Sequence, residues 1–321
     1  MGRVDVHHHI LPTEYVQKWK NAAGIPKGLT LPSWNVELDL QFMDRNDIDV
    51  SILSLSAPGL AFTSSADEAT KLCRSVNEYA KEISTSHPRR FGFFASVPPL
   101  TQINACLEEV RYSLDVLKAD GVALLSSYDD KYLGHEDFRP LWEELHSRNA
   151  VVFVHPTFGE TWGAPSDPTI PRPIIDFPHE TTRTAINLIT SNIVRDFSNC
   201  KIILSHGGGT LPYMATRVAH QTADLGLKDK TADDFIREAR SFYFDLALTG
   251  FETPIRLLQD FAGTDHILYG SDFPFAREGT ITPQIENINN TAMEDDVRHS
   301  IECGAARKLF SRFKTDENDG R

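Results

Sequence analysis

The sequence of 321 residues contains few cysteines and no long apolar segment. Its cysteines are Cys73, Cys106, Cys200 and Cys303, which are far apart and form no C-x-x-C pair. This spacing argues against a disulfide framework and against a thiolate zinc site, and it is typical of a reducing compartment. No apolar run reaches the roughly 18 residues of a membrane span, and the N-terminal residues lack an apolar signal core. We therefore expect a cytosolic protein without a membrane segment.

Basic residues are also scarce. The chain has 32 Lys and Arg against 45 Asp and Glu, which gives a formal net charge of −13. Because proteins that bind nucleic acid derive much of their affinity from Lys and Arg on phosphates, we expect no nucleic-acid partner. A small anionic substrate is still compatible with this charge, since a local site can oppose it. The hydrophobic content of 40% is ordinary for a globular protein and excludes a disordered chain.

Eight short apolar segments alternate with helical patterns. The predicted strands are Val4–His9, Val50–Leu55, Phe91–Val97, Gly121–Leu125, Val151–His155, Lys201–Ser205, Phe242–Leu246 and Ile267–Gly270. Apolar residues spaced three and four apart predict helices over Ala66–Ser86 and Ile103–Leu117, with further helices over Phe138–Ser147 and Thr181–Phe197. This alternation predicts an α/β fold with a parallel sheet, and eight such units predict a single (β/α)₈ TIM barrel over residues 1–313.

Three segments lie outside this scheme. Residues Asn21–Ser33 are rich in Gly and Pro and are expected to form a small insertion after the first strand. Residues Pro156–Pro178 contain six prolines and are expected to form a long loop after the fifth strand, acting as a lid or a packing insertion. The polar tail, residues 314–321, is expected to be disordered.

His7 and His9 carry the strongest signal of chemistry. They occupy alternate positions at the end of the first predicted strand, so both side chains should face the barrel interior while His8 faces away. Two adjacent imidazoles at a barrel mouth are a natural pair of metal ligands. A run of three histidines can also come from a tag, but this run lies within an apolar strand, which favours metal binding.

Three further strands lead into a polar residue. His155 ends the fifth strand, His206 follows the sixth and precedes Gly207–Gly209, and Asp272 follows the eighth. One such residue alone is commonly structural, but the active sites of (β/α)₈ barrels are built at the carboxyl ends of the strands. Together with the two histidines of the first strand, these residues match the ligand set of a divalent metal ion.

Four local segments narrow the interpretation: Asp5–Pro12, Val154–Pro156, Ser205–Gly209 and Gly270–Pro274. As a set they resemble the aminocarboxymuconate-semialdehyde decarboxylase family of the amidohydrolase superfamily. This family also contains γ-resorcylate, 5-carboxyvanillate and 6-methylsalicylate decarboxylases. The resemblance continues to Gly304–Leu309 and so covers nearly the whole chain; it implies a metal-dependent decarboxylase built on a barrel.

The resemblance also implies roles for individual residues. The implied ligands of one divalent ion are His7, His9, His155 and Asp272. Three nitrogens and a carboxylate favour Zn²⁺, although Mn²⁺ accepts the same set. His206 matches the catalytic histidine of the family. Arg217 matches an arginine that reaches a neighbouring subunit's site, which implies a homodimer or a larger assembly; a solvated helix residue is the equally weighted alternative.

The segment Glu37–Asp44 departs from the family pattern. Aminocarboxymuconate-semialdehyde decarboxylase carries an arginine shortly before a Met-Asp pair, where it binds the second carboxylate of the substrate, and no arginine precedes Met43-Asp44 here. We therefore expect a small aromatic substrate with one carboxylate, such as a salicylate. The aromatic residues nearest the motifs, which are expected to line the pocket or else to be core residues, are Phe158, Trp162, Phe273 and Phe275.

The fourth predicted strand bears on the number of metal ions. Two-metal hydrolases of this superfamily usually place a carbamylated lysine at its end, and residues 121–127 contain no lysine. This favours a single ion. One ion still permits hydrolysis by a metal-activated water, so hydrolysis stays open at this stage.

The leading hypothesis is non-oxidative decarboxylation of an ortho-hydroxybenzoate, foremost 6-methylsalicylate to 3-methylphenol (m-cresol) and carbon dioxide. The carboxylate and ortho-hydroxyl would chelate the metal, and Asp272 would protonate the carbon that bears the carboxylate, with His206 orienting or reprotonating it. In an alternative, His206 activates a metal-bound water that adds to the substrate first. The competing interpretations are another substrate of the same family, hydrolysis of lactones or amides, and a non-catalytic binding protein.

Overall fold

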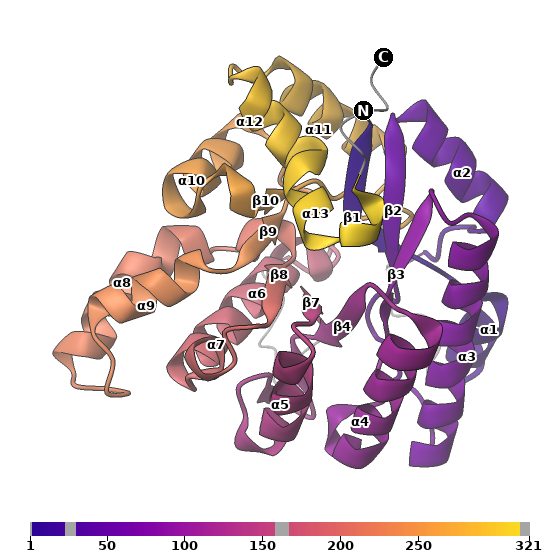
Figure 1. Cartoon of the computed structure of the whole chain (residues 1–321), viewed down its shortest axis with the longest axis horizontal. Coiled ribbons are helices and arrows are strands. Elements are labelled where there is room, and N and C mark those ends of the chain that lie inside the picture. The colour runs from indigo at the N-terminus through magenta and orange to yellow at the C-terminus, as the bar shows by residue number, and fades with distance from the viewer. Residues whose placement is uncertain (1, 23–29, 158–166, 315–321) are drawn as a thin grey trace.

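Eight parallel strands form a barrel in this computed structural model, which describes residues 2–22, 30–157 and 167–314 (Figure 1). In order around the sheet they are β1 (Arg3–His9), β2 (Ile48–Ser54), β3 (Phe91–Ala95), β4 (Gly121–Leu125), β7 (Val151–His155), β8 (Lys201–Leu204), β9 (Tyr243–Asp245) and β10 (Ile267–Leu268). The backbone N–H of Val6 donates to the carbonyl of Tyr269 at 3.0 Å, which joins β1 to the segment after β10. The predicted (β/α)₈ barrel is confirmed.

The helices surround the strands (Figure 1). The longer ones are α1 (Thr13–Ala22), α2 (Val36–Arg45), α3 (Ala66–Ser86), α4 (Ile103–Tyr112), α5 (Arg139–Ser147), α6 (Pro173–Thr190), α8 (Leu211–Asp224), α9 (Ala232–Arg240), α10 (Glu252–Ala262) and α11 (Glu278–Asn290). The short ones are α7 (Ile193–Asp196), α12 (Asp295–His299) and α13 (Ala305–Leu309). Within the described ranges, no helix is both long and apolar enough to cross a membrane. A small hairpin of β5 (Ser127–Tyr128) and β6 (Lys131–Tyr132) follows β4.

The helix predicted over Ile103–Leu117 has these bounds in the structure: it is α-helical to Tyr112 and ends in one π turn, Ser113–Leu117. Another predicted helix has different bounds. The helix predicted from Thr181 begins instead at Pro173, because proline needs no hydrogen-bonded N–H in the first turn. It ends at Thr190, and α7 is separate.

The loop and insertion predictions change accordingly. The loop predicted over Pro156–Pro178 is shorter than expected, because its last six residues are helical. The insertion predicted over Asn21–Ser33 begins late, since Asn21 still belongs to α1. Residues 23–29 and 158–166, and residues 315–321 of the predicted tail, lie outside the described residues.

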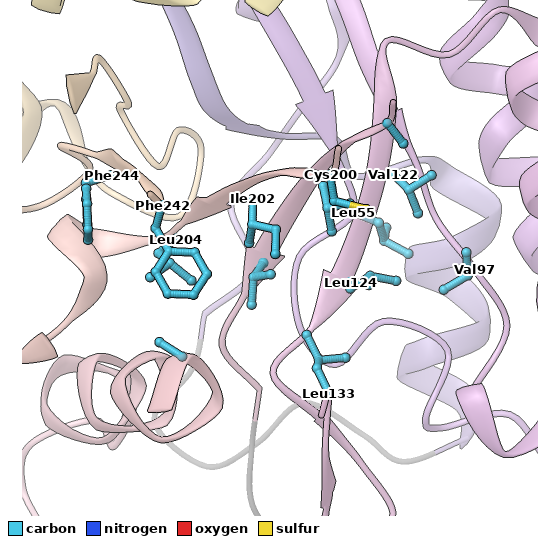
Figure 2. Close-up of a cluster of buried hydrophobic side chains, with 14 of the residues drawn as sticks. Leu55, Val97, Val122, Leu124, Leu133, Cys200, Ile202, Leu204, Phe242 and Phe244 are labelled. Carbon is cyan, nitrogen blue, oxygen red and sulfur yellow. The ribbon is translucent and has the colours of Figure 1, made fainter. Parts of the chain in front are cut away.

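The apolar residues of each strand alternate between two cores. In β8, Ile202 and Leu204 join the cluster between strands and helices, whereas Ile203 joins the cluster inside the barrel. Figure 2 shows part of the outer cluster, including Leu124 and Phe244. Because both faces of a parallel sheet are covered, such strands are apolar throughout. A polar residue that interrupts one of them therefore needs a specific reason.

Candidate metal centre

Four polar side chains converge at the carboxyl ends of the strands. They are His7 and His9 of β1, His155 of β7 and Asp272, and one donor atom from each lies within 4.8 Å of the others. His7 Nε2 is 3.1 Å from His9 Nε2, and Asp272 Oδ1 is 3.1 Å from His9 Nε2. Zinc–nitrogen bonds of 2.0–2.1 Å in a tetrahedral site place neighbouring donors about 3.3 Å apart. The donor set therefore fits one divalent ion, and these residues form a metal site.

The far nitrogens of two ligands are held by oxygen acceptors. His155 Nδ1 donates to the carbonyl of Pro156 at 2.7 Å. Ser54 Oγ donates its proton to the carbonyl of His8 at 3.2 Å. It therefore acts as the acceptor towards His9 Nδ1, which lies 3.0 Å away. Both rings thus carry their proton on Nδ1 and present the lone pair of Nε2 to the site.

The third histidine uses a carboxylate for the same purpose. His7 Nδ1 lies 2.9 Å from Asp245 Oδ2, and both side chains are completely buried. The other oxygen, Asp245 Oδ1, accepts from the backbone N–H groups of His206 and Ala247, each at 3.0 Å. The sequence analysis missed Asp245. The available signal was a carboxylate inside an otherwise apolar predicted strand.

Electrostatics suit Asp272 to be a ligand. Burial would raise the pKa of its carboxyl, but contacts with the imidazoles of His206, His7 and His9 hold that pKa well below its usual range. Asp272 is therefore ionised near neutral pH and acts as an acceptor.

The imidazoles differ among themselves. Burial lowers the pKa of His9, and it lowers that of His155 well below the usual value, so both rings are neutral as metal ligands must be. For His7, burial also opposes the charged form, but the carboxylates of Asp245 and Asp272 outweigh it and raise the pKa to about 10. Metal binding there would require His7 to lose a proton.

His8 faces away from the site, as its position in the strand predicted. Its Nδ1 lies 2.9 Å from Asp5 Oδ2 and its Nε2 lies 2.9 Å from Asp39 Oδ1, with all three side chains buried. Burial disfavours the charged ring, yet the carboxylates of Asp39 and Asp5 raise its pKa to about 10. The ion pair between His8 and Asp39 connects β1 to α2. His8 contributes no metal ligand.

His206 lies beside the metal ligands without joining them. Its Nε2 is 4.0 Å from Asp272 Oδ2, and its buried Nδ1 has no hydrogen-bond partner within the described part of the chain. His206 and Asp272 have φ values of +55° and +61°, the left-handed region that non-glycine residues avoid. Such backbone strain is typical of functional sites.

A cavity of about 350 Å³ opens next to His155. Its apolar wall includes Leu55, Val97 and Leu125, and hydroxyl groups from several Ser and Thr residues complete it. Among the described residues that line it, the carboxylates are Asp129 and Asp130, and none is Lys or Arg. The space accommodates a small organic molecule, and because the His155 ring is neutral, the described lining offers no cationic side chain.

The aromatic residues named from the sequence fall into different places. Phe275 lies beside the site, with its ring centroid 5.6 Å from that of His9. Phe273 instead stacks on Phe42 of α2 at 3.9 Å and lies 5.2 Å from the outward-facing His8. Phe273 therefore packs in the core and does not line the cavity, which is the second of the two locations expected for it. Phe158 and Trp162 lie outside the described residues.

Arg217 and Phe177 lie in different surroundings. Arg217 is exposed on α8, and no hydrogen bond or ion pair within the described ranges holds it. It does not belong to the site of its own chain as described. Phe177 of α6, which the sequence analysis missed, lies 5.8 Å from the ring of His155.

Comparisons with known proteins agree with this geometry. The profile of the amidohydrolase family matches residues 4–312. Decarboxylase yanB of Aspergillus niger is 45% identical over 98% of this chain and 89% of its own length. The 6-methylsalicylic acid decarboxylase of Penicillium expansum is 39% identical over 98% of both chains. A crystal structure of an amidohydrolase II superposes with a TM-score of 0.90 and 28% identity, covering 96% of this chain and 99% of the other.

Proposed function

The chain belongs to the amidohydrolase family, and from this premise we propose that it decarboxylates 6-methylsalicylate to 3-methylphenol and carbon dioxide. The observation that carries the proposal is the site of three histidines and one aspartate at the edge of a small cavity. Full-length similarity to decarboxylases, one of them named for 6-methylsalicylic acid, supports the substrate.

The charges of the cavity favour a substrate with a single carboxylate. Asp129 would repel a second carboxylate, and the described lining offers no Lys or Arg to receive it. Leu55, Val97 and Leu125 provide apolar surface for a ring and a methyl substituent. The departure at Glu37–Asp44, where the expected arginine is missing, supports the same choice.

The metal site supports a single divalent ion. Three imidazole nitrogens and a carboxylate suit Zn²⁺, which we propose as the ion, with Mn²⁺ as the alternative. A bound ion would supply positive charge that fixes the carboxylate and ortho-hydroxyl oxygens of the substrate and stabilises negative charge on them.

We assign the proton transfer to His206 rather than to Asp272. Asp272 lies next to three imidazoles and would supply a metal ligand, whereas the His206 ring lies outside the ligand set. In this assignment His206 donates a proton to the ring carbon that bears the carboxylate. The bond to the carboxyl carbon then breaks, its electron pair restores the aromatic ring, and carbon dioxide leaves. His206 regains a proton from solvent, so one proton is consumed per turnover.

The oligomeric state is part of the proposal. Arg217 projects from α8 without a partner in the described chain, and the resemblance places such an arginine in a neighbouring active site. We infer a homodimer in which Arg217 serves the partner's site. Mixing Arg217→Ala subunits with His206→Gln subunits would then create hybrid dimers with one intact site, and activity would reappear. No recovery after verified subunit exchange would contradict this role.

A substrate panel tests the proposed activity. Equal amounts of zinc-loaded protein are given 6-methylsalicylate, salicylate, 2,6-dihydroxybenzoate and 5-carboxyvanillate, and carbon dioxide release is measured. One methyl group in an apolar pocket changes kcat/KM about 10-fold or more. The kcat/KM for 6-methylsalicylate should therefore exceed that for salicylate by this factor. Faster turnover of 5-carboxyvanillate, which carries an extra polar substituent, would refute the substrate assignment.

A further inference from the structure

Asp245 lies where the metal site and the proposed proton donor meet. It is the last residue of β9, which lies between β8, leading to His206, and β10, leading to Asp272. Its side chain is completely buried, and it belongs neither to the ligand set nor to the cavity lining. A buried carboxylate at such a place requires partners, and it has three.

We propose that Asp245 is a positioning residue that sets the tautomer of His7 and anchors the backbone of His206. This inference rests on the proposed function, because it gives both histidines their roles in a metal-dependent decarboxylase. Asp245 Oδ2 accepts a hydrogen bond from His7 Nδ1 at 2.9 Å, so the proton stays on Nδ1 and Nε2 is the nitrogen left to bind a metal ion. Asp245 Oδ1 receives the N–H of His206 at 3.0 Å.

Only a carboxylate meets this demand. All three partners are donors, since Oδ1 also accepts from the N–H of Ala247 at 3.0 Å. An asparagine has the same shape but a single acceptor oxygen. That oxygen would face the two backbone N–H groups, and the amide NH₂ would face His7 Nδ1. His7 would then have to move its proton to Nε2, the atom that binds the metal.

The bond to His206 matters because that residue is strained. Its φ of +55° is followed by positive φ values at the next three residues, Gly207–Gly209. A tight turn of this kind needs support from outside its own backbone. The carboxylate of Asp245 provides it, so a single side chain holds a metal ligand and the proposed proton donor in one arrangement.

The test compares Asp245→Asn with Asp39→Asn. Asp39 is a matched control, because it is also completely buried and also lies 2.9 Å from a histidine, His8, that does not face the site. Zinc affinity is measured by competition with a chromophoric chelator, and thermal unfolding is measured on the metal-free proteins. We expect both variants to unfold at lower temperature. Only Asp245→Asn should lose zinc affinity, by about 10- to 100-fold.

A purely structural role makes a different prediction. In that case both variants would lose stability and keep the zinc affinity of the parent, which would overturn the proposal. The anchoring of His206 is tested with Asp245→Ala at saturating zinc. Asp245→Ala removes the acceptor of the His206 N–H, which Asp245→Asn keeps. Its kcat should therefore be lower than that of Asp245→Asn, with little change in KM. Equal kcat values in the two variants would refute the anchoring of His206.

A measurement on the unaltered protein covers the case in which the variants do not fold. Long-range proton–nitrogen spectra of the zinc-loaded protein, labelled with ¹⁵N-histidine, report which ring nitrogen carries the proton. Every zinc-bound histidine should carry it on Nδ1; metal bound through Nδ1 would contradict the assignment. Neither zinc affinity nor these spectra require a substrate, so failure here is distinct from failure of the proposed decarboxylation.

Discussion

Replacing Gly209 by alanine should damage both the fold and the active site. Gly209 has φ +62° and ψ −123°, and it ends the turn that begins at His206. A Cβ at this position would lie 1.9 Å from the carbonyl oxygen of Pro178 and 2.7 Å from Thr182 Oγ1. The first neighbour is backbone of α6 and cannot rotate away. Either α6 or the turn that carries His206 must therefore move.

The magnitude follows from two contributions. A non-glycine residue in this conformation costs about 1–3 kcal/mol, and overpacking against backbone costs about 1–3 kcal/mol more. Together they come to about 4 kcal/mol. With an unfolding entropy of about 2.1 cal/mol/K per residue, a chain of 321 residues loses about 6 °C in Tm.

Gly226→Ala is the control for this experiment. Gly226 has the same φ of +62°, but nothing lies within 4 Å of its hypothetical Cβ. Only the left-handed conformation is penalised, by about 1–2 kcal/mol, or about 2 °C. Calorimetry of the zinc-loaded proteins measures both shifts, and kcat should fall only in Gly209→Ala. Equal Tm losses and equal kcat values in the two variants would refute the argument from close packing.

Three other predictions concern the site and the thiols. His206→Gln should keep the zinc affinity of the parent and lose about 10²- to 10⁴-fold in kcat, as measured by chelator competition and carbon dioxide release; unchanged turnover would remove His206 from the reaction. Because the pKa of His7 is about 10 in the metal-free protein, zinc binding at pH 8 should release a proton and tighten as pH rises towards 10. Calorimetry in buffers of different ionisation enthalpy counts that proton, and none released would contradict the electrostatics. Burial raises the pKa of the Cys106 and Cys200 thiols to about 12, so neither should react with a thiol reagent at pH 8 until the protein unfolds; rapid labelling of the native protein would show otherwise.

The barrel was predictable because its strands are covered on both faces. A segment such as Val151–His155 is apolar at every position until its last residue, and that pattern marks both the strand and the functional residue at its end. His7 and His9 followed from the alternation of side chains along a strand. The metal site needed no long-range information, because every barrel strand directs its carboxyl end to the same face.

What could not be predicted depends on contacts between distant segments. The partner of Asp245 follows from the position of β9 in the closed barrel, which local sequence does not contain. A Cβ at Gly270 would lie 2.8 Å from the Cβ of His7, so this glycine permits a close approach at the site that the sequence does not reveal. Nearness to Asp272 in the sequence left Phe273 in either the pocket or the core, and only its stacking on Phe42 of α2 decides for the core.

The most direct test of the central claim is metal-dependent carbon dioxide release from carboxyl-¹³C-labelled 6-methylsalicylate. The protein is stripped with a chelator, restored with measured amounts of zinc or manganese, and assayed for labelled carbon dioxide and 3-methylphenol together. We predict no turnover without metal, activity that rises to a maximum at one ion per chain, and equal amounts of the two products. No labelled carbon dioxide from protein that holds one ion per chain would contradict the account and would direct attention to hydrolysis of lactones or amides.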